Sequence, residues 1–110
     1  MHQNFPTWQS VRNFLKQFPK QYLEHKDGYQ WRLQFGNQYQ LSIINHKTSM
    51  GYPDHYEIGI FGDCDTMTEL PGITEEGNNV KGYLTSSEID VIIMKMIAIT
   101  GNLPINVNKC

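Results

Sequence analysis

The chain has 110 residues, of which 39% are hydrophobic, 12% aromatic and 18% charged, and its formal net charge is −2. That length holds one hydrophobic core, while the aromatic content and the small net charge exclude an intrinsically disordered chain and an overall basic nucleic-acid-binding protein. The longest unbroken apolar run, residues 91–94, is far shorter than the roughly 20 residues that span a bilayer. The first residues contain no apolar stretch typical of a secretory signal, so we expect a cytoplasmic protein that does not engage a membrane.

The cysteine content also favours a reducing compartment. Cys64 and Cys110 are the only cysteines, which is unlike a disulfide-dense secreted scaffold, so we expect two free thiols. Cys64 lies between Asp63 and Asp65, whose carboxylates should raise the pKa of the thiol, the opposite of what a reactive nucleophile needs. We therefore interpret Cys64 as a small loop residue.

Apolar residues at helical spacing predict a first helix over residues 8–18. Thr7 is a suitable N-cap, and Pro19 ends the helix because it lacks a backbone donor and disfavours helical geometry in the residue before it. The apolar stripe consists of Trp8, Val11, Leu15 and Phe18. We expect this stripe to pack into the core.

Strict alternation of apolar and polar residues predicts an antiparallel hairpin of residues 29–35 and 39–43. Gly36-Asn37 supplies the tight turn between the two strands. In the first strand the apolar face consists of Tyr29, Trp31, Leu33 and Phe35.

Three further segments carry weaker strand patterns. Residues 56–60 alternate and predict a third strand, and residues 21–25 are a candidate short strand before the hairpin. Twenty residues without structure would be unusual between 62 and 81, so we expect a short fourth strand near residues 66–70 followed by an exposed loop.

The sequence Thr85-Ser-Ser-Glu88 is a capping box that opens a second helix over residues 86–99. This helix has little polar surface, so we expect it to be covered on more than one side. It lies against the sheet or, as the alternative, partly in the interface of a homodimer. Gly101 ends it. Residues 102–110 are expected to be a loose tail, with an edge strand as the alternative because Leu103, Ile105 and Val107 alternate with polar residues.

The predicted fold class is α+β, with an antiparallel meander sheet of three to four strands and an N-terminal and a C-terminal helix packed on one face. Residues 1–101 form the single domain and 102–110 its tail. Short connections favour antiparallel pairing, and no segment has the length of a parallel crossover.

Sequence motifs for catalysis and metal binding are missing. The chain contains no phosphate-binding glycine loop, nucleophile elbow, HExxH, CxxC or EF-hand spacing, so we expect no cofactor, no metal and no enzymatic activity. A minor enzymatic alternative would require His46, His55 and Asp63 to converge in space.

Charge placement is the unusual feature. Residues 54–80 carry seven acidic side chains and no Lys or Arg, whereas residues 1–53 carry six basic side chains and two acidic ones. Such a patch steers association with a basic partner, for example by imitating a nucleic-acid backbone, and the alternative is a solvated face that aids solubility. The seven acids are Asp54, Glu57, Asp63, Asp65, Glu69, Glu75 and Glu76.

A second polar patch lies on the outer face of the predicted hairpin. Gln30, Arg32 and Gln34 share that face of the first strand, opposite Gln40 and Ser42 of the second. A single-stranded nucleic acid would need aromatic rings there for stacking, and the hairpin aromatics point the other way, so direct nucleic-acid binding is not expected.

Several landmarks, taken together, carry a resemblance over roughly residues 5–97. They are the aromatic hairpin ending in Gln-Leu-Ser-Ile-Ile-Asn-His46, the loop with Gly51-Tyr52, the strand Tyr56-Glu-Ile-Gly-Ile60, Leu70-Pro-Gly-Ile-Thr74 and Gly82-Tyr-Leu-Thr-Ser-Ser-Glu88. In these the chain resembles small uncharacterised proteins encoded by bacteriophages and other mobile elements, with small integron cassette proteins as a related possibility. The resemblance implies a place in the cytosol of a host cell and the binding of a host or defence protein; it implies no catalytic residues.

Two hypotheses follow. In the first, the chain is a non-enzymatic accessory protein that binds and modulates a host or defence protein with a basic surface through the acidic residues of the 54–76 region. In the second, it binds and sequesters a small ligand or nucleotide in a pocket near the loop between two histidines, lined by His46, Tyr52 and His55.

Overall fold

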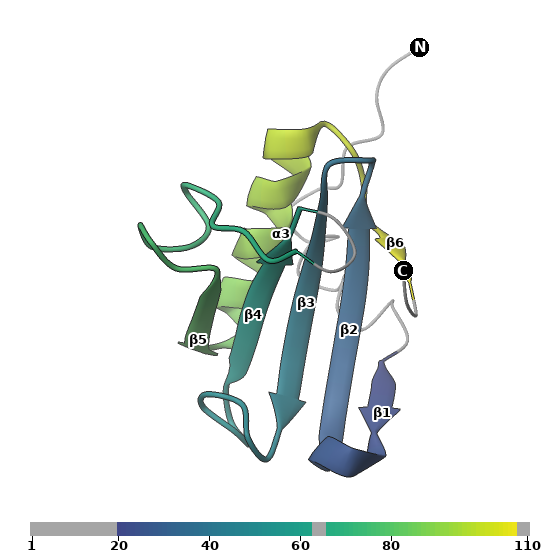
Figure 1. Cartoon of the computed structure of the whole chain (residues 1–110), viewed down its shortest axis with the longest axis vertical. Coiled ribbons are helices and arrows are strands. Elements are labelled where there is room, and N and C mark those ends of the chain that lie inside the picture. Colours follow the sequence, from purple (N-terminus) through teal and green to yellow (C-terminus); the bar gives the residue numbers. More distant parts are fainter. Residues whose placement is uncertain (1–19, 63–65, 108–110) are drawn as a thin grey trace.

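The computed structural model describes residues 20–62 and 66–107. Pairs of named strands are all antiparallel, their spatial order is β1-β2-β3-β4-β5, and β6 also pairs with β2 (Figure 1). In chain order the elements are β1 (Gln21–Leu23), the 3-10 helix η1 (Glu24–Lys26), β2 (Gly28–Phe35), β3 (Tyr39–His46), β4 (Tyr56–Phe61), β5 (Val80–Leu84), α3 (Ser86–Thr100) and β6 (Ile105–Asn106).

The predicted hairpin is confirmed as β2 and β3, each a little longer than expected. Their register places Trp31 opposite Ile43 and Leu33 opposite Leu41. Gly36 takes a φ of +59° in the connecting turn, a left-handed conformation that glycine adopts without steric cost. The alternation therefore gives the hairpin one apolar and one polar face.

The sheet has more strands than the three or four expected, and the fourth strand of the meander is not at residues 66–70. That segment only folds back on the end of β4: Met67 forms an isolated bridge with Phe61, and the backbone N–H of Thr68 donates to the carbonyl of Ile60 (3.0 Å). The strand that pairs with β4 is β5, which carries two irregularities, a register shift against β4 and a left-handed residue, Tyr83. These irregularities explain why residues 80–84 lack the alternation that marks a strand in sequence.

Two short strands cover the outer edge of β2. β1 pairs along Gly28–Gln30, so the candidate strand near residues 21–25 is present over three residues. β6 pairs with Leu33 and Gln34, and the N–H of Val107 donates to the carbonyl of Arg32 (2.9 Å). The edge-strand alternative for the C-terminal segment is therefore the one realised.

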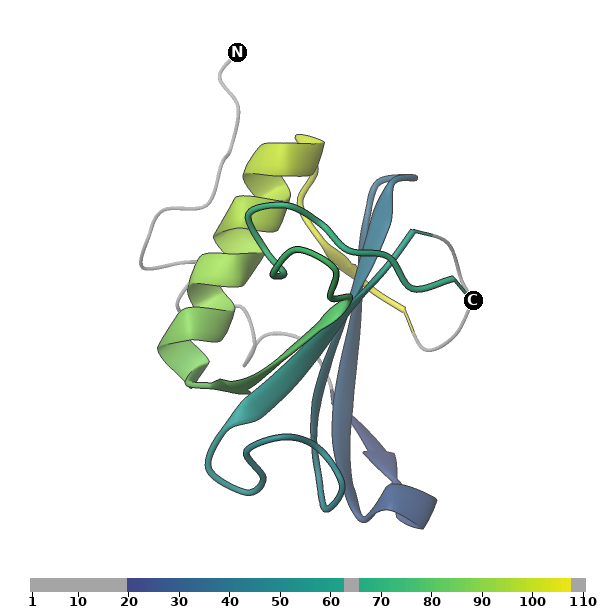
Figure 2. The same ribbon diagram turned by 60° about the vertical axis from the view of Figure 1, so that its left-hand side comes forward.

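α3 lies along one face of the sheet, which we call the helix face (Figure 2). The expected helix over residues 8–18 lies outside the described residues, so the described chain contains one α-helix where two were expected. The opposite, open face of the sheet carries no α-helix within residues 20–62 and 66–107. The class α+β with an antiparallel sheet is confirmed.

The core fills the space between the helix face and α3. It combines the inward residues of the three long strands with one side of the helix and two residues of the 66–79 connection, Leu70 and Ile73. Each buried Ile or Leu contributes about 1.5–3 kcal/mol relative to an exposed position. The residues with no exposed surface are Leu33, Phe35, Leu41, Ile43, Ile58, Ile60, Ile89, Ile93 and Met96.

The capping box at the start of α3 is confirmed in detail. The backbone N–H of Glu88 donates to Thr85 Oγ1 (3.2 Å), and the backbone N–H of Thr85 donates to Glu88 Oε1 (2.9 Å). The bond from the Thr85 backbone is the main reason that the pKa of Glu88 lies below its usual range. At the other end Gly101 takes a φ of +71° and its N–H donates to the carbonyl of Ile97 (2.7 Å).

Removing the cap should loosen the helix measurably. We expect Thr85→Ala to lower the free energy of unfolding by about 1 kcal/mol, because the N–H of Glu88 loses its acceptor. Ser86 is exposed, adjacent and outside the reciprocal pair of bonds that forms the cap, so Ser86→Ala is a matched control with little effect. Urea denaturation measures both, and equal stabilities of the two variants would contradict the assignment.

The same motif predicts a pH dependence. Because the pKa of Glu88 is lower in the folded chain, its carboxylate stabilises the fold above its unfolded-state pKa, and that contribution is lost as the pH falls through the folded value. The destabilisation caused by Glu88→Ala should therefore shrink when unfolding is measured in acid.

Candidate binding surfaces

Several of the acidic residues that are predicted to contact a partner also hold the chain in place locally. Glu57 Oε1 accepts from the backbone N–H of Met50 (2.8 Å), and Glu69 Oε2 accepts from that of Gly77 (2.8 Å). Glu75 pairs with Lys81, at 3.3 Å between Nζ and Oε1. The sequence pattern could not separate these structural carboxylates from free ones.

Two acids remain available at the surface. Asp54 and Glu76 are exposed and make no hydrogen bond or ion pair with the described residues. Asp63 and Asp65, together with both cysteines, fall outside the described residues.

The loop between β3 and β4 is organised by one side-chain amide. Asn45 Nδ2 donates to the carbonyls of Pro53 (3.0 Å) and His55 (2.9 Å), which ties the far end of the loop back to β3. Ser49 closes the near end: its Oγ donates to the carbonyl of His46 (2.8 Å) and accepts from the N–H of the same residue (3.0 Å). The loop is therefore a fixed part of the fold.

The structure places the three expected ligand residues in different surroundings. His46 is buried, with Nδ1 3.1 Å from Thr48 Oγ1, and it faces a hollow on the open face of the sheet. Tyr52 is exposed, His55 is half-buried, and neither lines that hollow. His46 is the last residue of β3 and keeps the strand's alternation, while Tyr52 and His55 belong to the loop, and a pocket holding all three residues stays a prediction.

The hollow on the open face has a volume of about 370 Å³ and crosses β2, β3 and β4. It brings together His46, a predicted ligand residue, and Glu57, a predicted acidic contact residue. Gly59, without a side chain, lies among its lining residues, and Met67 reaches over from the segment after β4. The lining residues are Leu23, Lys26, Gln30, Ser42, Ile44, His46, Glu57, Gly59, Phe61, Met67 and Val80.

The polar row beside this hollow is present as expected, but its members bond to one another. Gln30 Nε2 donates to Ser42 Oγ (2.9 Å) and Arg32 Nε donates to Gln40 Oε1 (2.7 Å). Gln40 Nε2 in turn donates to Gln34 Oε1 (2.6 Å). These hydrogen bonds join side chains of β2 and β3 into a connected polar network.

Sequence reasoning missed Phe61 as an open-face residue. The Arg32 guanidinium carbon lies 4.1 Å from the centre of the Phe61 ring, a cation–π contact. The ring could have been found by extending the alternation of Glu57 and Gly59 by one more step along β4.

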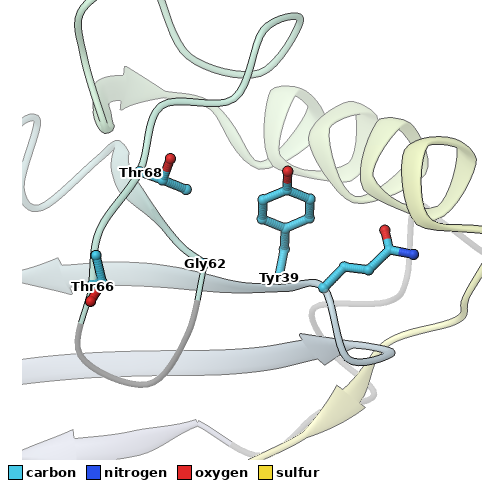
Figure 3. Close-up of a pocket in the computed structure, with 5 residues that line it drawn as sticks. Tyr39, Gly62, Thr66 and Thr68 are labelled. Atoms are coloured by element: carbon cyan, nitrogen blue, oxygen red, sulfur yellow. The ribbon is translucent and has the colours of Figure 1, made fainter.

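A second hollow, of about 600 Å³, opens at the other end of β3 (Figure 3). Figure 3 shows Tyr39 and Thr68 on either side of its opening. Its lining consists of Gln38, Tyr39, Gly62, Thr66 and Thr68, which offer hydroxyl and amide groups but no charge. This lining selects no particular ligand chemistry.

Tyr83 is a strained and exposed aromatic residue. Its φ is +57°, and 69% of its surface is exposed. For an L-residue this left-handed conformation costs roughly 1–2 kcal/mol, and an aromatic residue lacks the local hydrogen bonds that make it tolerable for Asp27. Gly51 allows the close approach, because a Cβ there would lie 3.1 Å from the Cα of Tyr83.

Relieving this strain should stabilise the protein. We expect Tyr83→Gly to exceed Tyr83→Ala by about 1 kcal/mol in free energy of unfolding, since both remove the ring and only glycine accepts the positive φ freely. Paired guanidinium denaturation curves measure the difference. A glycine variant that is no more stable than the alanine variant would show that the backbone relaxes.

The remaining expectations concern metals, membranes and self-association. Within residues 20–62 and 66–107 no three His, Cys, Asp or Glu side chains gather in a way that would hold a metal ion. In the same part of the chain, no helix has the length and apolar character to cross a bilayer. Ile99 leaves 44% of its surface exposed on α3, and a homodimer through that helix stays a prediction.

Comparisons of the chain with protein-family models, with curated proteins and with solved structures gave no match.

Proposed function

We propose that this chain is a non-enzymatic binding protein that takes a small ligand into the hollow on the open face of its sheet. The observation that carries the proposal is the convergence of apolar and polar side chains at that hollow, on the face that α3 leaves uncovered. Small-ligand sites are typically concave, largely apolar and furnished with a few fixed polar groups. A volume of about 370 Å³ suits a ligand at the small end of this class.

The setting of the hollow also suits binding without catalysis. His46 is buried and its ring is held at Nδ1 by Thr48, while Gln30 and Ser42 bond to each other. Groups that are fixed in advance lose little entropy when a ligand arrives. In this proposal the protein sequesters its ligand.

Filling the hollow should abolish binding. A thermal-shift screen of nucleotides and small amphipathic compounds identifies a ligand, which at 100 times its dissociation constant stabilises the fold by roughly 2.7 kcal/mol. Val80→Phe adds a ring at a half-buried lining position and should remove the shift. Val91→Phe makes the same change at a half-buried position of α3, on the other side of the sheet, and should keep it. A shift that survives Val80→Phe would place the ligand elsewhere.

A second candidate function is docking onto a host or defence protein with a basic surface, as expected of an accessory protein from a phage or mobile element. What favours it is the exposure of Asp54 beside two exposed aromatic residues, Tyr52 and Tyr83, at the loop that touches β5. Tyrosines are over-represented among the residues that dominate protein interfaces. Nearby carboxylates would steer a basic partner toward them.

This docking is testable through its charge dependence. A partner captured from host lysate at low salt should be lost at high salt, and the double variant Asp54→Asn, Glu76→Gln should retain less of it. Glu24→Gln removes an exposed acid outside the 54–76 region and should leave capture unchanged. Equal capture by the double variant and the wild type would exclude this surface.

A further inference from the structure

The hollow contains a carboxylate whose position is fixed. Glu57 stands on the open face of β4, opposite Ile44 of β3, and both residues line the hollow. The bond from the Met50 N–H to Glu57 Oε1 (2.8 Å) anchors the side chain between the strand and the rigid loop. A ligand therefore meets a negative charge that does not have to be ordered first.

Among residues 20–62 and 66–107, Glu57 forms no ion pair with a Lys, Arg or His side chain, although His46 and Lys26 line the same hollow. The two ion pairs there join Lys47 to Asp27 (3.0 Å) and Lys81 to Glu75 (3.3 Å). Lys26 of η1 is an exposed residue, and a long lysine side chain can line apolar surface with its stem while its ammonium group stays hydrated. A half-buried carboxylate of this kind gains most from a cation that brings its own hydrogen-bond donors.

Apolar side chains make up a large part of the lining around Glu57. They come from β1, β3, β4, β5 and the segment that follows β4. Methionine and phenylalanine side chains adapt well to a flat or aromatic ligand body. The apolar lining consists of Leu23, Ile44, Phe61, Met67 and Val80.

We infer that the ligand of this hollow is a small primary amine, whose protonated head meets Glu57 and whose apolar body lies against Ile44, Phe61 and Met67. The inference rests on the proposed ligand-binding function and narrows it to one chemical class. The volume of about 370 Å³ suits a body of one or two rings.

Three compounds with the same phenethyl body test the charge of the head. They are 2-phenylethylamine, 2-phenylethanol and 3-phenylpropionate, titrated into the full chain with nuclear magnetic resonance shifts of the hollow residues as the readout. We expect the amine to bind at least tenfold more tightly than the alcohol, and the carboxylate most weakly of the three.

Glu57→Gln keeps an oxygen that can accept from Met50 and removes the charge, so the amine should fall to the affinity of the alcohol. Glu69→Gln is a matched control: its carboxylate also accepts a backbone N–H, from Gly77 at 2.8 Å, but it does not line the hollow. The control should keep the preference for the amine.

The outcomes distinguish the inference of an amine ligand from the proposed function of ligand binding in the hollow. The inference of an amine ligand is wrong if the amine and the alcohol bind equally well, or if the carboxylate binds most tightly. It is also wrong if Glu57→Gln keeps the preference for the amine. In each of these cases, binding of the alcohol that is lost in Val80→Phe still supports the hollow as a ligand site. If none of the three compounds shifts the hollow residues, the amine inference fails. The proposed ligand-binding function also fails if the thermal-shift screen finds no compound whose binding is lost in Val80→Phe.

Discussion

The two-sidedness of the β2–β3 hairpin is the constraint on which the rest of the structure depends. Every second residue of these strands turns toward α3, and a slip of one position would exchange the two faces completely. The register that pairs Leu33 with Leu41 therefore settles both the core and the open face at once. The same pairing that buries the apolar side chains aligns the polar row of Gln30, Arg32 and Gln34 beside the hollow.

Local sequence patterns predicted the elements whose formation depends on interactions between residues close together in the chain. The hairpin follows from strict alternation, and the start of α3 follows from Thr85 and Glu88, whose side chains satisfy each other's backbone N–H groups. β5 could not be found in this way, since its pairing with β4 depends on a partner distant in sequence and on a left-handed residue near its end. Tertiary contacts there override what the residues prefer on their own.

For a related reason, the sequence predicted individual residues of the candidate site but not which of them lie together. His46 and Glu57 were both singled out, but for different surfaces, and only the strand register brings them to one hollow. The acidic residues were counted as charges, whereas Glu57 and Glu69 each accept a backbone N–H and so act as parts of the frame. Composition reports how much charge a segment has; whether a carboxylate faces solvent or the chain depends on backbone geometry.

The two short strands along the outer edge of β2 differ in how far along the chain they come from, and that difference bears on how the protein assembles. β1 reaches β2 through a single turn, while Ile105 must return across most of the molecule to meet Gln34. Closing so long a loop costs entropy, so we expect the hairpin to form before β6 docks. Without β6, the middle of β2 would be an unpaired edge, the kind of template on which chains associate strand to strand, so this short pairing also protects the sheet from edge-to-edge association.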